Sequence, residues 1–131
     1  MTYSRNAIYT RIVNAIRAEY PNAYCTSRRV ASPAKFPACL IHEIDNSRPI
    51  QNTQLDFEDV QHESVYEIKV VSNKENTAAT AAYGLMALAD AAFSGLYYRR
   101  FSQTNIDKGD TFTLISRYRR VIGGGDTMPT T

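Results

Sequence analysis

The strongest pattern in the sequence is an alternating segment that leads, after a short turn, into an alanine-rich segment. From residue 64 to residue 72, apolar side chains recur at every second position, which predicts a β-strand. One face of this strand would carry Tyr66, Ile68 and Val70, and the other Val65, Glu67, Lys69 and Val71. Residues 77–94 are rich in strong helix formers, which predicts a helix that ends at Gly95 as its C-cap residue. The many alanines would let this helix pack closely on its neighbours.

The remaining elements are predicted from similar patterns before and after these two segments. They are an amphipathic helix over 5–20, an extended run over 23–29, an irregular connection over 31–37, and strands over 38–45, 96–104 and 111–122, with a hairpin turn over 105–110. The order α-β-β-β-α-β-β, with hairpins in place of alternating strands and helices, is typical of an α+β domain. We therefore predict a mostly antiparallel sheet of about five strands with both helices on one face. The other face would be polar in a monomer, or would meet a neighbouring subunit in an oligomer.

The length and composition exclude several classes of protein. A chain of 131 residues is enough for one domain with its own core, which excludes a two-domain enzyme. We assign this domain to residues 1–122 and predict that 123–131 form a flexible C-terminal tail. The net charge of +2 is too small to imply DNA or an anionic membrane as partner. No signal peptide or membrane span is expected, so synthesis and folding are expected in the cytoplasm.

The cysteines and histidines show no pattern that points to chemistry. Cys25 and Cys39 lack the spacing of metal ligands or of a disulfide scaffold, and we interpret them as small buried residues in a reducing compartment. His42 and His62 lie in no catalytic motif, so a packed or surface position is the simpler interpretation. No catalytic residue, metal site or cofactor is therefore predicted.

One enzymatic hypothesis remains as an alternative. Glu67 and Lys69 form an acid-x-Lys pair on a predicted strand, and Asp45 ends the preceding strand. A metal-dependent nuclease would use such acids to hold Mg²⁺ and the lysine to stabilise the attacking water or the phosphate. The simpler interpretation is that Glu67 and Lys69 form the solvated face of an amphipathic strand.

The longest polar stretch, residues 46–61, is predicted to form an exposed hairpin arm. Loops longer than about 12 residues inside compact domains are usually functional or disordered, so this arm is a candidate for contact with a partner. Its few apolar side chains and its acids would make that contact. The predicted interface residues are Arg48, Ile50, Leu55, Asp56, Phe57, Glu58 and Asp59.

A second candidate surface lies on the last two predicted strands, where arginines alternate with aromatic residues. This arginine cluster consists of Arg99, Arg100, Arg117, Arg119 and Arg120, interleaved with Tyr97, Tyr98, Phe101 and Tyr118. It could hold phosphates with stacking on the rings, as in a nucleic-acid-binding module, or pair with acids of another subunit. A solvated basic face with ordinary cross-strand pairing is the alternative.

Several short phrases, together with the order of elements, point to a known family. The phrases are Tyr20-Pro21-Asn22-Ala23-Tyr24, Phe36-Pro37 before a strand that ends Glu43-Ile44-Asp45-Asn46, the run from Tyr66 to Lys74, the alanine-rich helix, and the closing run from Ser116 to Ile122. Over about residues 3–122 the chain resembles the tail terminator, or tail completion, proteins of long-tailed bacteriophages, which are often labelled minor capsid or tail component proteins.

The resemblance implies structural work in the virion and no catalysis. Proteins of this kind form a homo-oligomeric ring, usually a hexamer, that caps the head-proximal end of the tail tube and ends its polymerisation. The implied partners are the major tail tube protein, a head-completion or neck protein, and DNA that passes through the lumen. The functional surfaces would be the arm over 46–61, the sheet edge and the strands that bear the arginine cluster. The arm would reach across the joint between subunits, where its acids would meet arginines of the neighbour. A head-completion or neck adaptor is a related alternative, but the two antiparallel hairpins favour the tail side.

Overall fold

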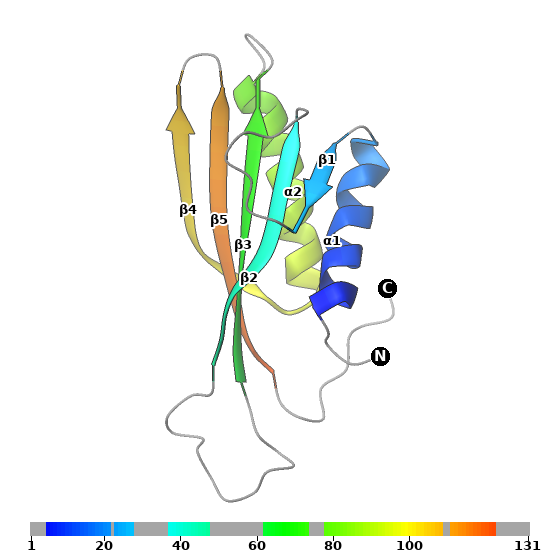
Figure 1. The fold of residues 1–131 in the computed structure, drawn as a ribbon, viewed down its shortest axis with the longest axis vertical. Helices are drawn as coiled ribbons and strands as arrows, with labels where there is room; N and C mark the ends of the chain where they lie inside the picture. The colour runs from blue at the N-terminus through cyan, green and yellow to red at the C-terminus, as the bar shows by residue number, and fades with distance from the viewer. Residues whose placement is uncertain are drawn as a thin grey trace, which may run out of the picture.

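The fold is an α+β arrangement of two helices and one sheet, as predicted (Figure 1). The computed structural model describes residues 5–21, 23–27, 37–47, 62–73, 78–108 and 111–122. Their elements are α1 (Arg5–Glu19), β1 (Tyr24–Thr26), β2 (Ala38–Ser47), β3 (His62–Ser72), α2 (Ala78–Gly95), β4 (Arg99–Asp107) and β5 (Phe112–Ile122). The predicted tail and residues 48–61 of the predicted arm, with all of its interface residues, lie outside the described residues.

The sheet has the strand order β1-β2-β3-β5-β4. Strands β2, β3, β5 and β4 pair antiparallel with their neighbours, which confirms the mostly antiparallel prediction, whereas β1 pairs parallel with β2. The hairpin of β2 and β3 is longer than predicted, because Ser47 still pairs with Glu63. No helix within the described residues is long and apolar enough to cross a membrane.

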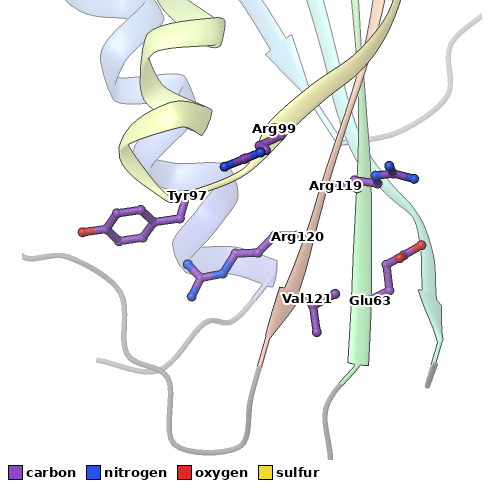
Figure 2. Close-up of a pocket in the computed structure, with 6 residues that line it drawn as sticks. All are labelled: Glu63, Tyr97, Arg99, Arg119, Arg120 and Val121. Carbon is purple, nitrogen blue, oxygen red and sulfur yellow. The ribbon is translucent and has the colours of Figure 1, made fainter. Parts of the chain in front are cut away.

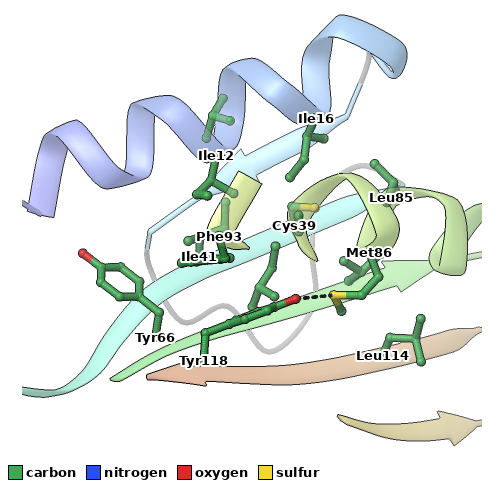
Figure 3. Close-up of a cluster of buried hydrophobic side chains, with 14 of the residues drawn as sticks. Ile12, Ile16, Cys39, Ile41, Tyr66, Leu85, Met86, Phe93, Leu114 and Tyr118 are labelled. Carbon is green, nitrogen blue, oxygen red and sulfur yellow. Dashed lines mark hydrogen bonds between the residues drawn. The ribbon is translucent and has the colours of Figure 1, made fainter. Parts of the chain in front are cut away.

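Both helices cover the same face of the sheet, as predicted (Figure 1). The alternation of β3 is confirmed, because Tyr66, Ile68 and Val70 point into the core beneath the helices. Figure 3 shows this core, in which the largest fully buried side chains include Ile12, Ile16, Ile41, Tyr66, Ile68, Leu85, Met86, Phe93, Leu114 and Tyr118. Full burial of one such side chain stabilises the fold by about 1.5–3 kcal/mol, so this face holds the domain together.

The small residues of α2 allow close packing between the helices. Ala82 and Ala89 are fully buried. Gly84 faces Tyr20, which follows the end of α1, and a Cβ atom at this position would overlap with the Tyr20 hydroxyl oxygen. The predicted close approach of a neighbour to the alanine-rich helix is therefore found, and Gly84 is its tightest point.

An aromatic cluster joins the end of α2 to the sheet. The rings of Phe93 and Tyr118 stack at 4.2 Å between centroids, and Tyr98 meets both Tyr66 and Phe93 edge-on. Such pairs contribute about 0.5–1.5 kcal/mol each beyond their buried area. The Tyr118 hydroxyl donates to Asp90 Oδ1. It also lies 3.8 Å from the sulfur of Met86 (Figure 3).

The end of α2 differs from the prediction that Gly95 would cap it. The helix runs through Gly95, and the left-handed position falls on Tyr97, with a φ of 67°. The amide of Tyr98 donates to Phe93 O and that of Tyr97 to Ser94 O, which is the hydrogen-bond pattern of a Schellman motif. Leu96 and Tyr98 are both buried on either side of Tyr97, so the chain must turn there. The strand predicted from residue 96 consequently begins at Arg99.

Candidate interaction surface on strands β4 and β5

The arginine cluster lies on two adjacent antiparallel strands, as predicted, but it divides between the two faces of the sheet. Arg99 lies opposite Arg119, and Arg117 lies opposite Ser102, all on the face that carries no helix. Arg100 and Arg120 lie on the helix side. Side chains alternate across a strand, so neighbours in sequence such as Arg119 and Arg120 must point in opposite directions.

The two arginines on the helix side connect the sheet to α2 and to the turn that follows it. Arg100 Nη1 lies 2.8 Å from Asp90 Oδ2. Arg120 Nη1 donates to the carbonyl oxygen of Leu96 at 2.7 Å, and its guanidinium lies 5.3 Å from the ring centroid of Tyr97. A cation at the C-terminal end of a helix also interacts favourably with the helix dipole. We therefore assign Arg100 and Arg120 to the structure of the monomer.

Arg117 belongs to a row of polar side chains that crosses three strands. Its Nε donates to Glu67 Oε2 at 3.0 Å, and Nε2 of His42 lies 3.4 Å from Glu67 Oε1. The arginine of the Arg117–Glu67 pair is about half exposed, and ion pairs at a protein surface contribute about 0.2–1 kcal/mol. Both oxygens of the Glu67 carboxylate are therefore engaged by side chains of the protein itself.

This row also bears on the nuclease hypothesis. Asp45 lies opposite Val65 and so shares the helix-free face with Glu67 and Lys69. However, Glu67 is held by Arg117, and the described residues contain no group of three or more metal-ligating side chains. A metal ion at Glu67 would have to displace the arginine.

Arg99 and Arg119 form the most unusual pair on this face. They are cross-strand partners, both are exposed, and the described residues place no carboxylate within ion-pair distance of either. The guanidinium of Arg119 lies 5.3 Å from the ring centroid of Phe101. Like charges directly opposite each other destabilise a sheet, so this pair lowers the stability of the isolated chain.

A pocket of about 340 Å³ surrounds these arginines at the end of the sheet. Figure 2 shows its lining residues, which are Glu63, Tyr97, Arg99, Arg119, Arg120 and Val121. Three guanidinium groups against one carboxylate give the pocket a net positive charge. The pocket therefore suits an anionic group.

Large apolar side chains are exposed around the same arginines. Tyr97 is 66% exposed, Phe101 47% and Val121 46%. We call the exposed residues Tyr97, Arg99, Phe101, Arg119 and Val121 the arginine surface. Aromatic residues and arginine are enriched at protein interfaces, whereas lysine and acids are depleted there. The composition of the arginine surface is therefore that of an interface.

The arginine surface adjoins an open sheet edge. Strand β4 is the last strand of the sheet, runs for 9 residues, and has all but one of its residues exposed, including the apolar Ile106. An edge strand of this length presents unpaired backbone groups to another chain. The register shift between Arg100 and Ser102 places Phe101 in an irregular position, which interrupts regular pairing near the arginines.

Sequence reasoning named the arginines, Tyr97 and Phe101, but it missed Val121 of the arginine surface and two residues beside that surface. Val121 and Glu63 line the pocket, and Ile106 is exposed on the edge strand. The alternation of β5 carried the signal for Val121, since it places residues 117, 119 and 121 on one face. The position of Glu63 in the pocket depends on the pairing of β3 with β5, and no local sequence pattern specifies that pairing.

No family model matches the chain, and no curated protein is a significant match. The chemistry of the arginine surface is therefore the main structural basis for a functional proposal.

Proposed function

We propose that the protein is a non-enzymatic assembly protein of a bacteriophage tail, in which copies of the chain form a ring at the head-proximal end of the tail tube. The observation that carries this proposal is the Arg99–Arg119 pair beside exposed Tyr97, Phe101 and Val121. Exposed apolar side chains grouped beside a repulsive charge pair favour a surface that another molecule covers. The sequence resemblance to tail terminator proteins supports the choice of a phage tail as the assembly.

A ring requires a heterologous interface, in which one surface of a subunit meets a different surface of the next. The arginine surface and the β4 edge supply one side. The other side must be acidic, and the sequence concentrates acids at Asp56, Glu58 and Asp59. Our proposal pairs these acids of one subunit with Arg99 and Arg119 of the next. The match of charge would fix the register of the ring.

The proposed partners beyond the ring are the major tail tube protein and a head-completion or neck protein, with DNA in the lumen. The proposed location is the virion tail, after synthesis in the host cytoplasm. No catalytic residue, cofactor or metal ion takes part. The engagement of Glu67 by Arg117 is consistent with a structural role for that carboxylate.

The test is the mass and shape of the purified protein, alone and with isolated tail tubes, by native mass spectrometry and electron microscopy. The expected result is a ring, either free or seated on tube ends. Arg119→Glu should weaken the ring, whereas Lys108→Glu makes the same charge change on an exposed residue outside the arginine surface and should leave it intact. A strict monomer that never associates with tubes would contradict the proposal.

A nucleic-acid-binding module is the second candidate, because Arg119 beside Phe101 could hold a phosphate and a base together. Direct binding to an oligonucleotide separates the two candidates. Nucleic-acid binding weakens steeply with salt, in proportion to the number of phosphates contacted. Tight binding of a single-stranded oligonucleotide that is lost in Arg99→Gln would favour the module, whereas rings without such binding favour the assembly protein.

A further inference from the structure

The two cysteines, which have no relation in the sequence, are direct neighbours in the sheet. Cys25 of β1 and Cys39 of β2 are register partners in the parallel pair. Adjacent strands lie about 4.8 Å apart, and the Cα atoms of disulfides lie roughly 4.4–6.8 Å apart, so the backbone spacing allows a bond. Both thiols are free in this structure.

Their side chains also share one face of the sheet. Cys39 belongs to the core cluster beneath the helices (Figure 3), and Cys25 packs against the same cluster. Their neighbours Tyr24, Ala38 and Leu40 belong to a separate cluster on the opposite face. The two sulfur atoms therefore point to the same side of neighbouring strands, as a bond between them requires.

The environments of the two thiols differ in a way that gives them separate roles. Cys25 is half-buried on a strand at the sheet edge, whereas Cys39 is fully buried. Hydrogen bonding from the Cys39 thiol, together with the positive charge and a hydrogen bond of Arg17, lowers the pKa of Cys25 to about 7. The hydrogen bond with Cys25 and burial raise the pKa of Cys39 well above its usual range. Cys25 is thus an accessible nucleophile, and Cys39 is a protected thiol beside it.

We propose that Cys25 and Cys39 form a reversible dithiol–disulfide site that reacts with small disulfides of the glutathione class. In the first step the Cys25 thiolate attacks one sulfur of the disulfide RSSR, which forms Cys25–S–SR and releases RS⁻. In the second step the Cys39 sulfur attacks the Cys25 sulfur, loses its proton to the released thiolate, and expels the second RS⁻, which takes a proton from water. Two protein thiols are oxidised and one RSSR is reduced to two thiols.

A disulfide between Cys25 and Cys39 would add a covalent link between β1 and the rest of the sheet. This strand has only 3 residues and joins the sheet through three register pairs with β2. A disulfide between its central residue and β2 would tie it covalently to a long strand of the core sheet. The site is therefore a means of fixing the sheet edge under oxidising conditions, and it is independent of the proposed ring.

The test is intact-mass and peptide-mass analysis of the reduced protein after incubation with oxidised glutathione. The wild type should lose two hydrogen atoms and yield a linked peptide that contains Cys25 and Cys39. Cys39→Ala should stop at a glutathione adduct on Cys25, and Cys25→Ala should stay unmodified. If Cys39→Ala fails to fold, as judged by circular dichroism, Cys39→Ser serves the same purpose.

The rate of the first step tests the contribution of Arg17. Arg17→Gln should slow the reaction of Cys25 by roughly two- to threefold at neutral pH and move its pH midpoint upward, because less thiolate is present. Arg11→Gln removes the same charge elsewhere on α1 and should change neither. A stable glutathione adduct on wild-type Cys25 without the internal bond, or equally fast modification of Cys39 in Cys25→Ala, would overturn the proposal.

Discussion

Arg99 and Arg119 lie directly opposite each other on β4 and β5, and the described residues supply no carboxylate to either. A change of charge in this pair should therefore affect the stability of the monomer and the assembly of the ring in opposite directions. Arg99→Glu turns a repulsive cross-strand pair into an attractive one, so the monomer should become more stable by roughly 0.2–1 kcal/mol. The same change removes one cation from the proposed interface, so ring formation should weaken.

Urea unfolding and sedimentation of Arg99→Glu measure the two effects separately. Lys108→Glu is the control, because it makes the same charge change on an exposed residue beyond the end of β4. Loss of stability in Arg99→Glu, or rings as stable as those of the wild type, would contradict the role assigned to the pair.

Gly84 and Tyr20 give a prediction about packing between the helices. Alanine is favoured over glycine in a helix by about 0.8–1 kcal/mol, but the added Cβ overlaps with the Tyr20 hydroxyl. Overpacking costs about 1–3 kcal/mol, so Gly84→Ala should lower the free energy of unfolding by about 1 kcal/mol. In Tyr20→Phe the nearest remaining atom is the ring carbon Cζ at 3.5 Å, an ordinary contact.

Gly84→Ala should therefore stabilise the Tyr20→Phe protein, while it destabilises the wild type. A double-mutant cycle measured by denaturant unfolding checks this reversal of sign. The same effect of Gly84→Ala in both backgrounds would show that the hydroxyl is not the limiting contact.

Tyr97 gives a prediction about the helix end. Its φ of 67° lies in the left-handed region, which costs roughly 1–2 kcal/mol for a residue with a Cβ atom. Tyr97→Gly removes this strain but also removes the ring beneath Arg120, so a net gain of about 0.5 kcal/mol is expected. Tyr97→Val keeps the strain, adds branching and should destabilise.

Thermal unfolding of the wild type, Tyr97→Gly and Tyr97→Val measures the order of their stabilities. Tyr97 belongs to the arginine surface, so the more stable glycine variant should also assemble less well. A glycine variant that is both less stable and fully competent in assembly would contradict this account of Tyr97.

Tyr98 gives a prediction for alkaline pH. Burial raises the pKa of Tyr98 from 10.0 to about 12, against the smaller opposing effect of its hydrogen bond to Ser64. Because the folded-state pKa is raised, this contribution to stability is complete below pH 10 and is lost as the pH rises toward 12 and above. The loss from Tyr98 should reach about 2 kcal/mol by pH 12.

Unfolding in urea at several pH values measures this slope. Tyr98→Phe should be less stable at neutral pH, because it loses the hydrogen bond to Ser64, but its stability should fall less steeply above pH 10. Equal slopes for both proteins would mean that Tyr98 does not control the alkaline transition.

The sequence predicted those parts of the fold that local patterns specify. The alternation around Ile68 and the alanine-rich run around Ala89 each determine one element and its buried face. Tyr97 was missed because Gly95 is the better intrinsic C-cap, and the burial of Leu96 and Tyr98 outweighs that preference.

The candidate sites were less predictable because they depend on pairing between distant strands. Nothing near Cys25 indicates that β1 pairs in parallel with β2, and so the proximity of Cys39 was not foreseen. The placement of Arg119 and Arg120 on opposite faces of the sheet could have been predicted from the sequence, because adjacent residues of a strand point to opposite faces.

The acidic stretch of the sequence gives the sharpest test of the proposed ring. Asp56, Glu58 and Asp59 lie outside the described residues, so their role remains a prediction from sequence. Replacing all three with lysine should abolish rings, because like charges would then face Arg99 and Arg119 of the neighbour. Unchanged assembly would count against the contact.

A charge swap then separates this contact from general effects of charge. The variant with all three lysines should recover rings when Arg99 and Arg119 are both replaced by Glu in the same chain, because opposite charges again face each other across the joint. Sedimentation at low and high salt measures the recovery, which should diminish as salt screens the pairs. Rings that return when Lys108 and Arg11 are reversed instead would assign the effect to net charge, whereas recovery confined to Arg99 and Arg119 would place the acids of one subunit against the arginines of the next.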